Sequence, residues 1–402
     1  MNIFVLNRGS SSIKCYLYQF EQEPKATMNA SWEAIVQWKN SFDDPTLCIK
    51  DSQGNQHIER IDGKSASFAL KYAMQLLTDG KTSVLKSLSE IDAVGHRIVH
   101  GGNFFSESVL VTPDVKEKIR QLSELAPLHN LPELEGIEIV EKLLPNAPQV
   151  AVFDTAFHHT LPQAAHVYPG PFEWYEAGVR RYGFHGISFQ YCSQRADEML
   201  NKKADDLRAV ICHLGSGASL CAVRGGKSID TTMGFTPLEG LMMDTRSGSI
   251  DPGIILHFLK DKKKSVDWIE EQLYNESGLL GVSKISSDMR DIIEMSIKGD
   301  ARAKLAFDVY LHRLNALIGS MVASLRGIDL LIFTAGIGEN ASILREKVCD
   351  AFSFLGVKLD PRKNEPSPRE DCILSSSDSK VQVLLIHTQE AFEIARQCWN
   401  IS

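Results

Sequence analysis

Two segments about half the chain apart carry the same pattern: an apolar strand, a Gly-Ser turn and a second strand. The first segment, residues 3–15, turns at Gly9, and the second, residues 209–221, turns at Gly215. A strand that breaks into Gly and Ser exposes backbone N–H groups and hydroxyls, which suit phosphate oxygens. Either segment alone is typical of an ordinary hairpin turn. Because both stand at one sequence offset, the pattern favours an internal duplication with a phosphate-binding turn in each half.

The length of 402 residues predicts two domains, because single cores seldom grow this large. Strand-like and helix-like patterns alternate along both halves, which is typical of α/β domains with parallel or mixed sheets. We expect one domain to comprise residues 1–150 plus about 386–402, and the other to comprise residues 151–385. The helical patterns include residues 82–89 and residues 132–143.

Composition excludes several classes of partner. A net charge of −8 and a pI near 5.9 match poorly with a nucleic-acid surface or an anionic membrane, so we expect neither partner. The eight cysteines contain no C-x-x-C pair and mostly lie in apolar, strand-like contexts, which is typical of reduced core residues in a cytosolic protein. No signal-peptide pattern opens the chain and no apolar run reaches the length of a membrane span, so we expect a cytoplasmic location.

A third anion-type loop lies at residues 330–340, where a buried-type strand runs through Gly336 and Gly338 into a helix. Such a turn presents unpaired N–H groups and the positive end of a helix dipole to an anion. The dinucleotide fingerprint G-x-G-x-x-G is incomplete here, and no G-x-x-x-x-G-K-[ST] motif occurs. The sequence therefore argues against a dehydrogenase and against a P-loop enzyme.

Glycine-rich segments surround two arginines and one histidine. Arg97 lies in Gly-His-Arg-Ile-Val-His-Gly-Gly, His185 follows Arg-Arg-Tyr-Gly-Phe, and Arg246 lies in the glycine-rich stretch 230–252. An arginine among small residues can present its fork to a carboxylate or a phosphate with little crowding. Each segment alone fits a surface arginine or a packed histidine equally well, but together they indicate a site for anions.

Taken in order, these segments resemble the acetate kinase family over essentially the whole chain, from residue 3 to about residue 397. The motifs that carry the resemblance are Asn7-Arg-Gly-Ser-Ser-Ser-Ile-Lys14, Gly95-His-Arg97-Ile-Val-His-Gly-Gly102, Ala126-Pro-Leu-His129-Asn130, Val152-Phe-Asp154-Thr-Ala-Phe-His158, Arg180-Arg-Tyr-Gly-Phe-His185-Gly186, Met233-Gly-Phe-Thr-Pro-Leu-Glu-Gly-Leu-Met-Met243, Thr245-Arg246-Ser-Gly248 and Phe333-Thr-Ala-Gly-Ile-Gly-Glu-Asn340. The resemblance implies the α/β fold of the actin/sugar-kinase/heat-shock ATPase superfamily, with two duplicated actin-like (ribonuclease H-like) domains and a nucleotide cleft between them. It also implies a homodimer with contacts through the C-terminal domain.

The activity that the resemblance implies is the reversible, Mg²⁺-dependent transfer of the ATP γ-phosphoryl group to acetate. This direct in-line transfer would give acetyl phosphate and ADP. By position, Asn7 and Glu390 are implied to arrange Mg²⁺, or Mn²⁺ in its place. Phosphate contacts are implied for Ser10, Ser12 and Lys14.

The catalytic residues implied in the same way are Arg97, Asp154, His185 and Arg246. The two arginines would hold the acyl carboxylate and the transferring phosphoryl group, and the histidine would hydrogen-bond the latter. The residues implied around the methyl group of acetate are Val99, Leu128, Phe184 and Pro237. The residues implied to bind the nucleotide are His213, Leu214, Gly215, Ser216, Gly217, Asp288, Met289, Arg290, Gly336, Ile337, Gly338, Glu339 and Asn340.

These residue types suit the chemistry. Phosphoryl transfer passes through a loose transition state whose charge is spread, so catalysis is mainly alignment and cationic stabilisation. A carboxylate acceptor is already ionised near pH 7 and needs no general base. We therefore expect Asp154 to orient an arginine or a metal-bound water rather than to remove a proton.

The chain departs from the family pattern at several positions, namely Arg8, Ile187, Phe189, Ser216, Asp244 and Ser249. Ser216 keeps a hydroxyl for phosphate but lacks the amide of the usual asparagine. Asp244 stands two residues before Arg246, where glycine is usual. It adds negative charge where an anion should bind, unless it pairs with Arg8 or Lys14.

Four alternatives stay open. A propionate or butyrate kinase would share the catalytic residues and differ in the acyl pocket. A pyrophosphate-dependent relative would alter the adenosine loops, and a non-catalytic nucleotide-binding protein would lack Arg97, His185 and Arg246. A metal hydrolase is disfavoured because the twelve histidines include no H-E-x-x-H motif.

Overall fold

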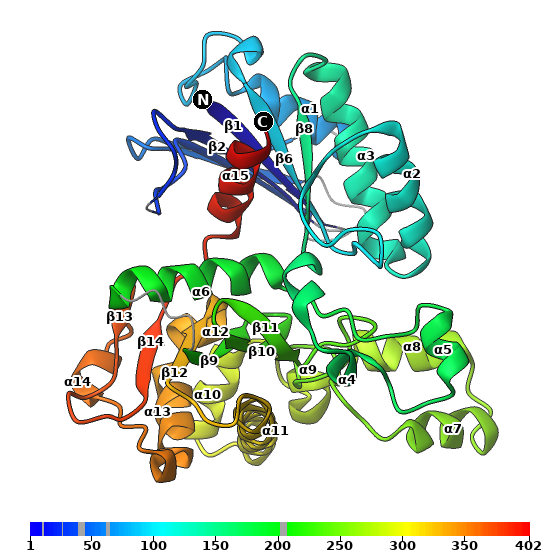
Figure 1. The fold of residues 1–402 in the computed structure, drawn as a ribbon, viewed down its shortest axis with the longest axis vertical. Coiled ribbons are helices and arrows are strands. Elements are labelled where there is room, and N and C mark those ends of the chain that lie inside the picture. Colours follow the sequence, from blue (N-terminus) through cyan, green and yellow to red (C-terminus); the bar gives the residue numbers. More distant parts are fainter. Residues whose placement is uncertain (10–11, 26, 39–44, 62–64, 202–206) are drawn as a thin grey trace. The chain divides into compact units, whose positions relative to one another are not determined.

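The computed structural model describes residues 1–9, 12–25, 27–38, 45–61, 65–201 and 207–402 (Figure 1). The chain forms two compact units. Unit 1 comprises Met1–Ala156 and Gln389–Ser402, and unit 2 comprises Phe157–Thr388. The boundaries expected from the sequence were residue 150 and about residue 386. Within the described residues, no helix combines the length and the apolar character that crossing a membrane requires.

Unit 1 is built on an eight-stranded sheet in the order β5-β4-β3-β2-β1-β6-β8-β7. Its strands are β1 (Asn2–Arg8), β2 (Ser12–Gln19), β3 (Trp32–Gln37), β4 (Thr46–Asp51), β5 (Gln56–Arg60), β6 (Ala93–Ile98), β7 (Val109–Leu110) and β8 (Gln149–Phe153). Strands β1 to β5 form an antiparallel meander, whereas β1, β6 and β8 run parallel to one another.

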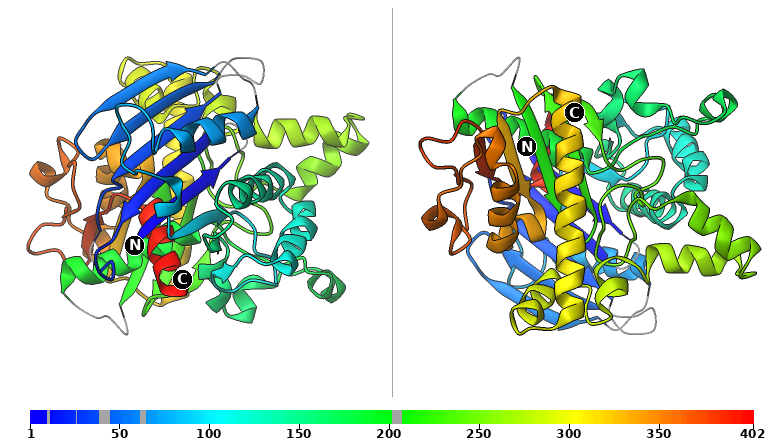
Figure 2. Two further views of the ribbon diagram at one scale, coloured as in Figure 1. Left: turned by 90° about the horizontal axis from the view of Figure 1, so that it is seen from above. Right: turned by 90° about the horizontal axis from the view of Figure 1, so that it is seen from below.

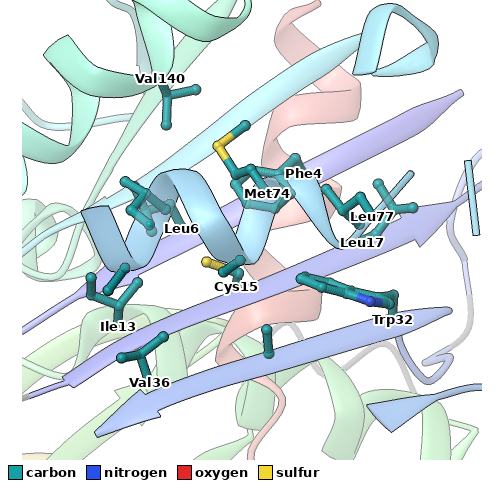
Figure 3. Packing of buried hydrophobic residues seen from close by; sticks show 14 of the residues in the cluster. Phe4, Leu6, Ile13, Cys15, Leu17, Trp32, Val36, Met74, Leu77 and Val140 are labelled. Carbon is teal, nitrogen blue, oxygen red and sulfur yellow. The ribbon is translucent and has the colours of Figure 1, made fainter. Parts of the chain in front are cut away.

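Helices cover both faces of this sheet. Phe4 and Leu6 of β1 lie in a buried cluster with α1 (Ala66–Gln75) and α3 (Pro127–Leu143) (Figure 3). The C-terminal helix α15 (Glu390–Ile401) packs on β1 and β6 (Figure 1). A Cβ atom on Gly95 of β6 would lie 2.5 Å from Cys398 Sγ, so this glycine allows α15 its close approach. The remaining elements are α2 (Pro113–Gln121) and the 3₁₀ turns η1 (Leu88–Glu90) and η2 (Leu122–Glu124).

Unit 2 is built on a six-stranded sheet in the order β11-β10-β9-β12-β14-β13. Its strands are β9 (Arg208–Leu214), β10 (Ala218–Arg224), β11 (Lys227–Thr231), β12 (Leu330–Thr334), β13 (Cys372–Ile373) and β14 (Gln382–Leu385). Helix α6 (Gly186–Leu200) packs on one face and the long helix α11 (Ala301–Leu325) on the other (Figures 1 and 2).

The other short elements of the chain beyond β8 are η3 (Ala156–Thr160), α4 (Gln163–His166), α5 (Phe172–Glu176), α7 (Pro252–Lys260), α8 (Val266–Tyr274), α9 (Gly278–Ser283), α10 (Met289–Ile297), α12 (Ala335–Asn340), α13 (Ser342–Ala351), η4 (Ser353–Leu355) and α14 (Pro361–Asn364).

The two sheets share one connectivity, which confirms the expected duplication. In each, an antiparallel three-stranded meander (β1-β2-β3 or β9-β10-β11) is extended by two parallel strands (β6 and β8, or β12 and β14). In each, a short antiparallel strand (β7 or β13) then borders the last parallel strand. The fold is therefore α/β with two duplicated domains, as the sequence predicted.

The two Gly-Ser hairpins differ by one residue in their pairing. Asn7 pairs with Lys14 in unit 1, whereas the matching His213 pairs with Ser219 in unit 2. The turn of unit 2 is therefore one residue shorter. Consequently the two cysteines that share a sequence offset, at the end of each segment, do not occupy equivalent positions in the two ladders.

Several helical segments differ from the sequence-based prediction, among them α10 and α12, which were not predicted. Residues 82–87 are not helical, and residues 88–89 belong to the 3₁₀ turn η1, which a capping box between Ser87 and Glu90 begins. Helix α3 begins at Pro127 rather than near residue 132, since a proline in the first turn needs no N–H partner. Helix α6 was not predicted. It follows His185, whose left-handed backbone offers none of the usual side-chain capping signals.

Candidate active site

The predicted residues of unit 1 lie at the carboxyl ends of its parallel strands. Asn7 lies near the end of β1, Arg97 near the end of β6, and Asp154 directly after β8. Because β1, β6 and β8 are neighbours and run parallel, these strand ends meet at one edge of the sheet. Glu390 is the first residue of α15, which packs on β1 and β6.

Arg97 and Asp154 form an ion pair through Nη2 and Oδ2. Burial raises the pKa of Asp154 to about 6, with Arg97 acting to lower it and the carboxylate of Glu390 adding to the rise. Burial disfavours the charged form of Arg97, but Asp154, Glu390 and Glu133 together raise its pKa. Among the described residues, Asp154 Oδ1 is buried without a hydrogen-bond partner. One oxygen of the carboxylate thus orients Arg97, and the other is available to a further ligand.

A buried glutamate holds the backbone beside the predicted acyl pocket. Glu133 of α3 is 2% exposed, and its Oε2 accepts the N–H of Val99 at 2.9 Å. Burial raises the pKa of Glu133 to about 8, against the lowering effects of Arg97 and of the Val99 bond. Sequence reasoning missed Glu133. The available signal was its place on the same helical face as Ile137 and Val140, where a polar residue is unusual.

The remaining predicted residues of unit 1 lie on or after the first hairpin and on α3. Ser12 and Lys14 lie on β2, and Lys14 is exposed and pairs with Asn7 in the β1–β2 ladder. Ser10 lies outside the described residues, as does the side chain of Leu128. Phosphate or acyl contacts of these residues stay predictions.

In unit 2, the two predicted histidines stack on each other. The ring centroids of His185 and His213 are 4.2 Å apart and the planes are inclined by 18°. Nδ1 of His185 lies 2.8 Å from Ser219 Oγ, and Nδ1 of His213 lies 2.8 Å from Ser188 Oγ. Since both serines are fully buried, these contacts fix the orientation of both rings.

Arg246 approaches His185 beside Gly217. A Cβ atom on Gly217 would lie 3.3 Å from His185 Nε2 and 3.6 Å from Arg246 Nη1, so both side chains lie against this turn. Arg246 Nη1 donates to the Pro237 carbonyl oxygen at 2.9 Å, and Gly248 with φ of 69° forms the bend after it. Burial lowers the pKa of the Arg246 guanidinium, which nevertheless stays cationic near neutral pH. An arginine, a histidine and a Gly-Ser turn are thus gathered at the end of β9.

A pocket of about 770 Å³ opens beside this turn. Its wall contains the Gly215–Ser216 turn, residues 288–290, and Gly336, Ile337 and Asn340 of α12. The structure therefore brings the three segments predicted for the nucleotide into one pocket. Sequence reasoning missed the contribution of α10, whose Ile293 and Ile297 also line the wall at helical spacing.

Glu339, also predicted to bind the nucleotide, turns its carboxylate toward backbone groups. Its Oε1 accepts the N–H of Ala335 at 2.9 Å and the N–H of Thr388 at 3.2 Å. Leu214 and Gly338 are buried in the structure around the pocket. Direct nucleotide contacts of these three residues stay predictions.

Two departures from the family pattern meet at the wall of the pocket. Ser216 and Asp244 both line it, and the Ser216 hydroxyl donates to the Asp244 carboxylate. Burial raises the pKa of Asp244, the Ser216 bond lowers it, and the neighbouring Asp288 adds to the rise. Arg8, which the sequence analysis named as a potential partner of Asp244, makes an ion pair with Glu135 within unit 1 at 2.5 Å.

The four residues predicted around the acetate methyl group divide between the units. Val99 and Leu128 belong to unit 1, and Phe184 and Pro237 belong to unit 2. Val99 is 4% exposed and Phe184 is 2% exposed. The predicted catalytic residues divide in the same way. In the described part of the chain, no cluster of three or more His, Cys, Asp or Glu side chains could hold a metal ion.

Known proteins resemble this chain over its full length. The sequence profile of the acetokinase family matches residues 2–396. The acetate kinase of Trichormus variabilis is 51% identical over 403 residues, which cover 100% of this chain and 99% of that protein. The crystal structure of Porphyromonas gingivalis acetate kinase matches with a TM-score of 0.92 and 40% identity, covering 100% of this chain and 99% of that one. A propionate kinase from Francisella tularensis matches with a TM-score of 0.90 and 36% identity, covering 100% of both chains.

Proposed function

Because the chain belongs to the acetokinase family, we propose that it is an acetate kinase that transfers the γ-phosphoryl group of ATP to acetate. The reaction is reversible and gives acetyl phosphate and ADP by direct in-line transfer. The observation that carries the proposal is the arrangement in unit 2, where Arg246 and His185 approach Gly217 beside a pocket of nucleotide size. This arrangement places cationic and hydrogen-bonding groups next to a cavity that the phosphate donor can occupy.

The pocket supports a nucleotide as the donor. Its volume of about 770 Å³ is within the usual range for cofactor sites. Ile293, Ile297 and Ile337 supply apolar surface for a base, while the Gly215–Ser216 turn offers backbone and hydroxyl groups for phosphates. A pyrophosphate donor would leave the apolar end of this pocket empty, so the pocket favours ATP.

The chemistry follows from charge and alignment. Arg246 and His185 in unit 2 stabilise charge on the transferring group, and Arg97 in unit 1 holds the carboxylate of the acceptor. Acetate arrives ionised, so no base is required. The ion pair between Asp154 and Arg97 gives the aspartate a positioning role, because its Oδ2 fixes the guanidinium that binds the acceptor.

Mg²⁺ fits the oxygen donors of unit 1. The orphaned Asp154 Oδ1, the Asn7 amide oxygen and the Glu390 carboxylate are hard ligands of the kind that Mg²⁺ prefers. Asn7 and Glu390 would hold the ion, with water and phosphate completing its shell, and Mn²⁺ could take its place. When bound, the metal neutralises phosphate charge. The side chains of the protein orient the phosphoryl donor and the acceptor.

The identity of the acceptor substrate has a specific alternative, which is propionate. A propionate kinase is among the structures that match over the full length. Val99 is 4% exposed and its backbone is fixed by Glu133, so this side chain cannot easily retreat from a longer acyl chain. This rigidity favours acetate over propionate.

We also propose a homodimer formed through unit 2. Helix α7 is rich in Ile, Leu and Phe, yet none of its residues is buried. Ile254 is 44% exposed and Leu256 is 51% exposed. Figure 2 shows α7 and α8, in yellow-green, extending as an arm from unit 2. Exposed apolar surface of this kind marks an interaction site, and Ile254→Asp with Leu256→Asp should give monomers in size-exclusion chromatography.

A cytoplasmic location agrees with the cysteines. All eight are free, and six of them are buried. Free thiols of this number are usual in a reducing compartment.

One assay tests the activity directly. Acyl phosphate formation should be measured with ATP and Mg²⁺ on acetate, propionate and butyrate side by side, with pyrophosphate as an alternative donor. We expect acetate and ATP to give the highest kcat/KM. No acetyl phosphate with any donor would refute the proposal, whereas equal rates with propionate would widen it to a short-chain acyl kinase.

A further inference from the structure

The segment that leads the chain from unit 2 back to unit 1 is hydrogen-bonded to the nucleotide loop. Thr388, the last residue of unit 2, donates its N–H to Glu339 Oε1 at 3.2 Å. The same oxygen accepts the N–H of Ala335 at 2.9 Å. Ala335 has a φ of 64°, a left-handed conformation that non-glycine residues seldom adopt. One carboxylate oxygen therefore holds both the strained residue that opens α12 and the end of unit 2.

The hydroxyl of the same threonine reaches the histidine pair. Thr388 Oγ1 lies 2.9 Å from Ser188 Oγ, which lies 2.8 Å from His213 Nδ1. His213 in turn stacks on His185. A continuous set of contacts thus runs from the predicted phosphate-contacting histidine to Thr388.

The residue before Thr388 is anchored separately. The N–H and Nδ1 of His387 lie 2.8 Å and 3.2 Å from Asp371 Oδ1. Asp371 Oδ2 accepts a hydrogen bond from Arg195 Nε of α6 at 2.7 Å. The segment before Thr388 is therefore tied to α6. Thr388 itself is bonded to Glu339 of one predicted nucleotide segment and, through Ser188 of α6, to His213 of another. Glu390 follows two residues later.

We infer that Ser188, Thr388 and Glu339 are positioning residues that transmit occupation of the nucleotide pocket to Glu390. The inference rests on the proposed nucleotide and metal sites. Thr388 is bonded to Glu339 and to Ser188, and Ser188 in turn contacts His213. A nucleotide that orders the loop after Ala335 restrains Glu339 directly, and one that orders the turn after His213 restrains Ser188 through that histidine. Fixing Thr388 restricts the two peptide units that follow it, and these carry the metal-binding carboxylate. The network can position Glu390 only while all of its hydrogen bonds are formed, so the loss of any one bond should remove the effect.

Amide hydrogen exchange of residues 386–396, measured with and without ADP, tests the inference without any acceptor. ADP should slow exchange in the parent protein. Thr388→Val keeps the shape but lacks the hydroxyl, and should lose most of the ADP-dependent difference, whereas Thr388→Ser should keep it. The control is Thr160→Val, which removes a comparable bond from Thr160 Oγ1 to the Ser228 carbonyl at 2.9 Å in unit 2. This variant should leave the ADP-dependent difference unchanged.

Kinetics supply a second readout. Ser188→Ala and Thr388→Val should each lower kcat about 10-fold and raise the Mg²⁺ concentration for half-maximal rate, with the KM for ATP changed by less than about 3-fold. The double variant should be no worse than the single ones, because both interrupt one chain of bonds.

Two outcomes of the exchange experiment would overturn the inference: ADP binding without protection of residues 386–396 in the parent, or ADP-dependent protection that persists in Thr388→Val. Additive losses in the double variant would also overturn it. Failure of ADP to bind at all would instead refute the proposed nucleotide site, which is a separate and recognisable result.

Discussion

Glu133 Oε2 accepts the backbone N–H of Val99 at 2.9 Å, and the other oxygen of the same carboxyl group is buried without a partner among the described residues. The contact joins α3 to the chain just after β6, between Arg97 and the predicted lining of the acyl pocket. A buried acid is a costly way to hold a backbone group. Because Glu133 both affects the stability of unit 1 and holds the backbone of Val99, a change at Glu133 should alter the stability and the proposed acceptor site together.

The first prediction concerns pH and stability. Burial raises the pKa of Glu133 from its ordinary 4.5 to about 8, so the folded state binds a proton that the unfolded state has lost. The resulting stabilisation is fully present below pH 4.5 and is lost as the pH rises through 8. In this window the free energy of unfolding should fall by about 1.4 kcal/mol per pH unit for the one proton. Denaturant titrations at several pH values measure it.

Glu133→Gln provides the comparison, since its amide oxygen can still accept the Val99 N–H. The variant should show a flatter pH dependence between pH 5 and 8. Glu138→Gln on the same helix, where the side chain is 41% exposed, should behave like the parent. Identical slopes in the parent and in Glu133→Gln would show that Glu133 is ionised in the folded state.

The second prediction is that both arginines are needed for turnover. Arg97→Ala and Arg246→Ala should each lower kcat/KM by about 100-fold or more, because each guanidinium contacts charge that develops in the transition state. Lysine should rescue only partly, since the forked geometry is lost. Arg208→Ala is the control. It removes an ion pair with Asp329 in unit 2, so it should affect stability more than rate. Near-normal activity in both alanine variants would refute the mechanism.

Sequence reasoning succeeded where the determining contacts are local. The duplication could be predicted because a Gly-Ser turn and its two strands lie within 13 residues in each half. The family resemblance predicted three segments to bind the nucleotide, and the structure shows that residues of all three line one pocket; nucleotide binding itself stays a prediction. Strand order explains why two of these segments meet, because β9 and β12 are neighbours and the segments follow these strands. It does not place residues 288–290, which lie at the start of α10.

The contacts that sequence could not predict join residues far apart in the chain. Ser188 and Thr388 are 200 positions apart, and Val99 and Glu133 are 34 apart. Serine and threonine are common and do not stand out by type, and Glu133 stands out only by its place on an apolar helix face. The partners of all three depend on how helices pack on the sheets. Helix α7 is a case in which the sequence predicts a feature that the single chain does not have. Its apolar sequence predicts burial, and yet no residue of it is buried in the single chain.

The third prediction is that Glu390 acts through the metal. Glu390→Ala should lose activity and need more Mg²⁺ for its residual rate, while thermal stabilisation by ATP persists. The competing explanation is that Glu390 only stabilises the start of α15 through the helix dipole. That explanation predicts a lower melting temperature with an unchanged Mg²⁺ dependence. Measuring both quantities on one variant separates the two.

The fourth prediction concerns Asp244, which lines the proposed nucleotide pocket. Burial raises its pKa, and Asp288 adds to the rise. Its ionised form repels an anionic ligand, so ADP should bind more weakly as the pH rises through this pKa. Asp244→Asn should remove that part of the pH dependence, and Asp244→Gly should tighten ADP binding by roughly 10-fold, or ~1.4 kcal/mol. Calorimetric titration with ADP measures both effects. If the pH dependence of ADP binding is the same in the parent and in Asp244→Asn, it arises from the phosphates of ADP and not from Asp244.

The fifth prediction concerns the length of the acyl chain. Val99 is 4% exposed, and the bond from its backbone to Glu133 prevents it from moving aside. A pocket that is tight around a methyl group discriminates against one more methylene by ~1–3 kcal/mol, so propionate should have a kcat/KM roughly 10-fold or more below that of acetate. Val99→Ala should narrow or invert this preference by opening space for the extra carbon. Because the change is confined to the acceptor side, the KM for ATP should stay the same, and Glu133→Gln provides a control that keeps the valine. Equal kcat/KM for acetate and propionate in the parent enzyme would mean that Val99 does not limit the pocket and that the enzyme is a broad short-chain acyl kinase.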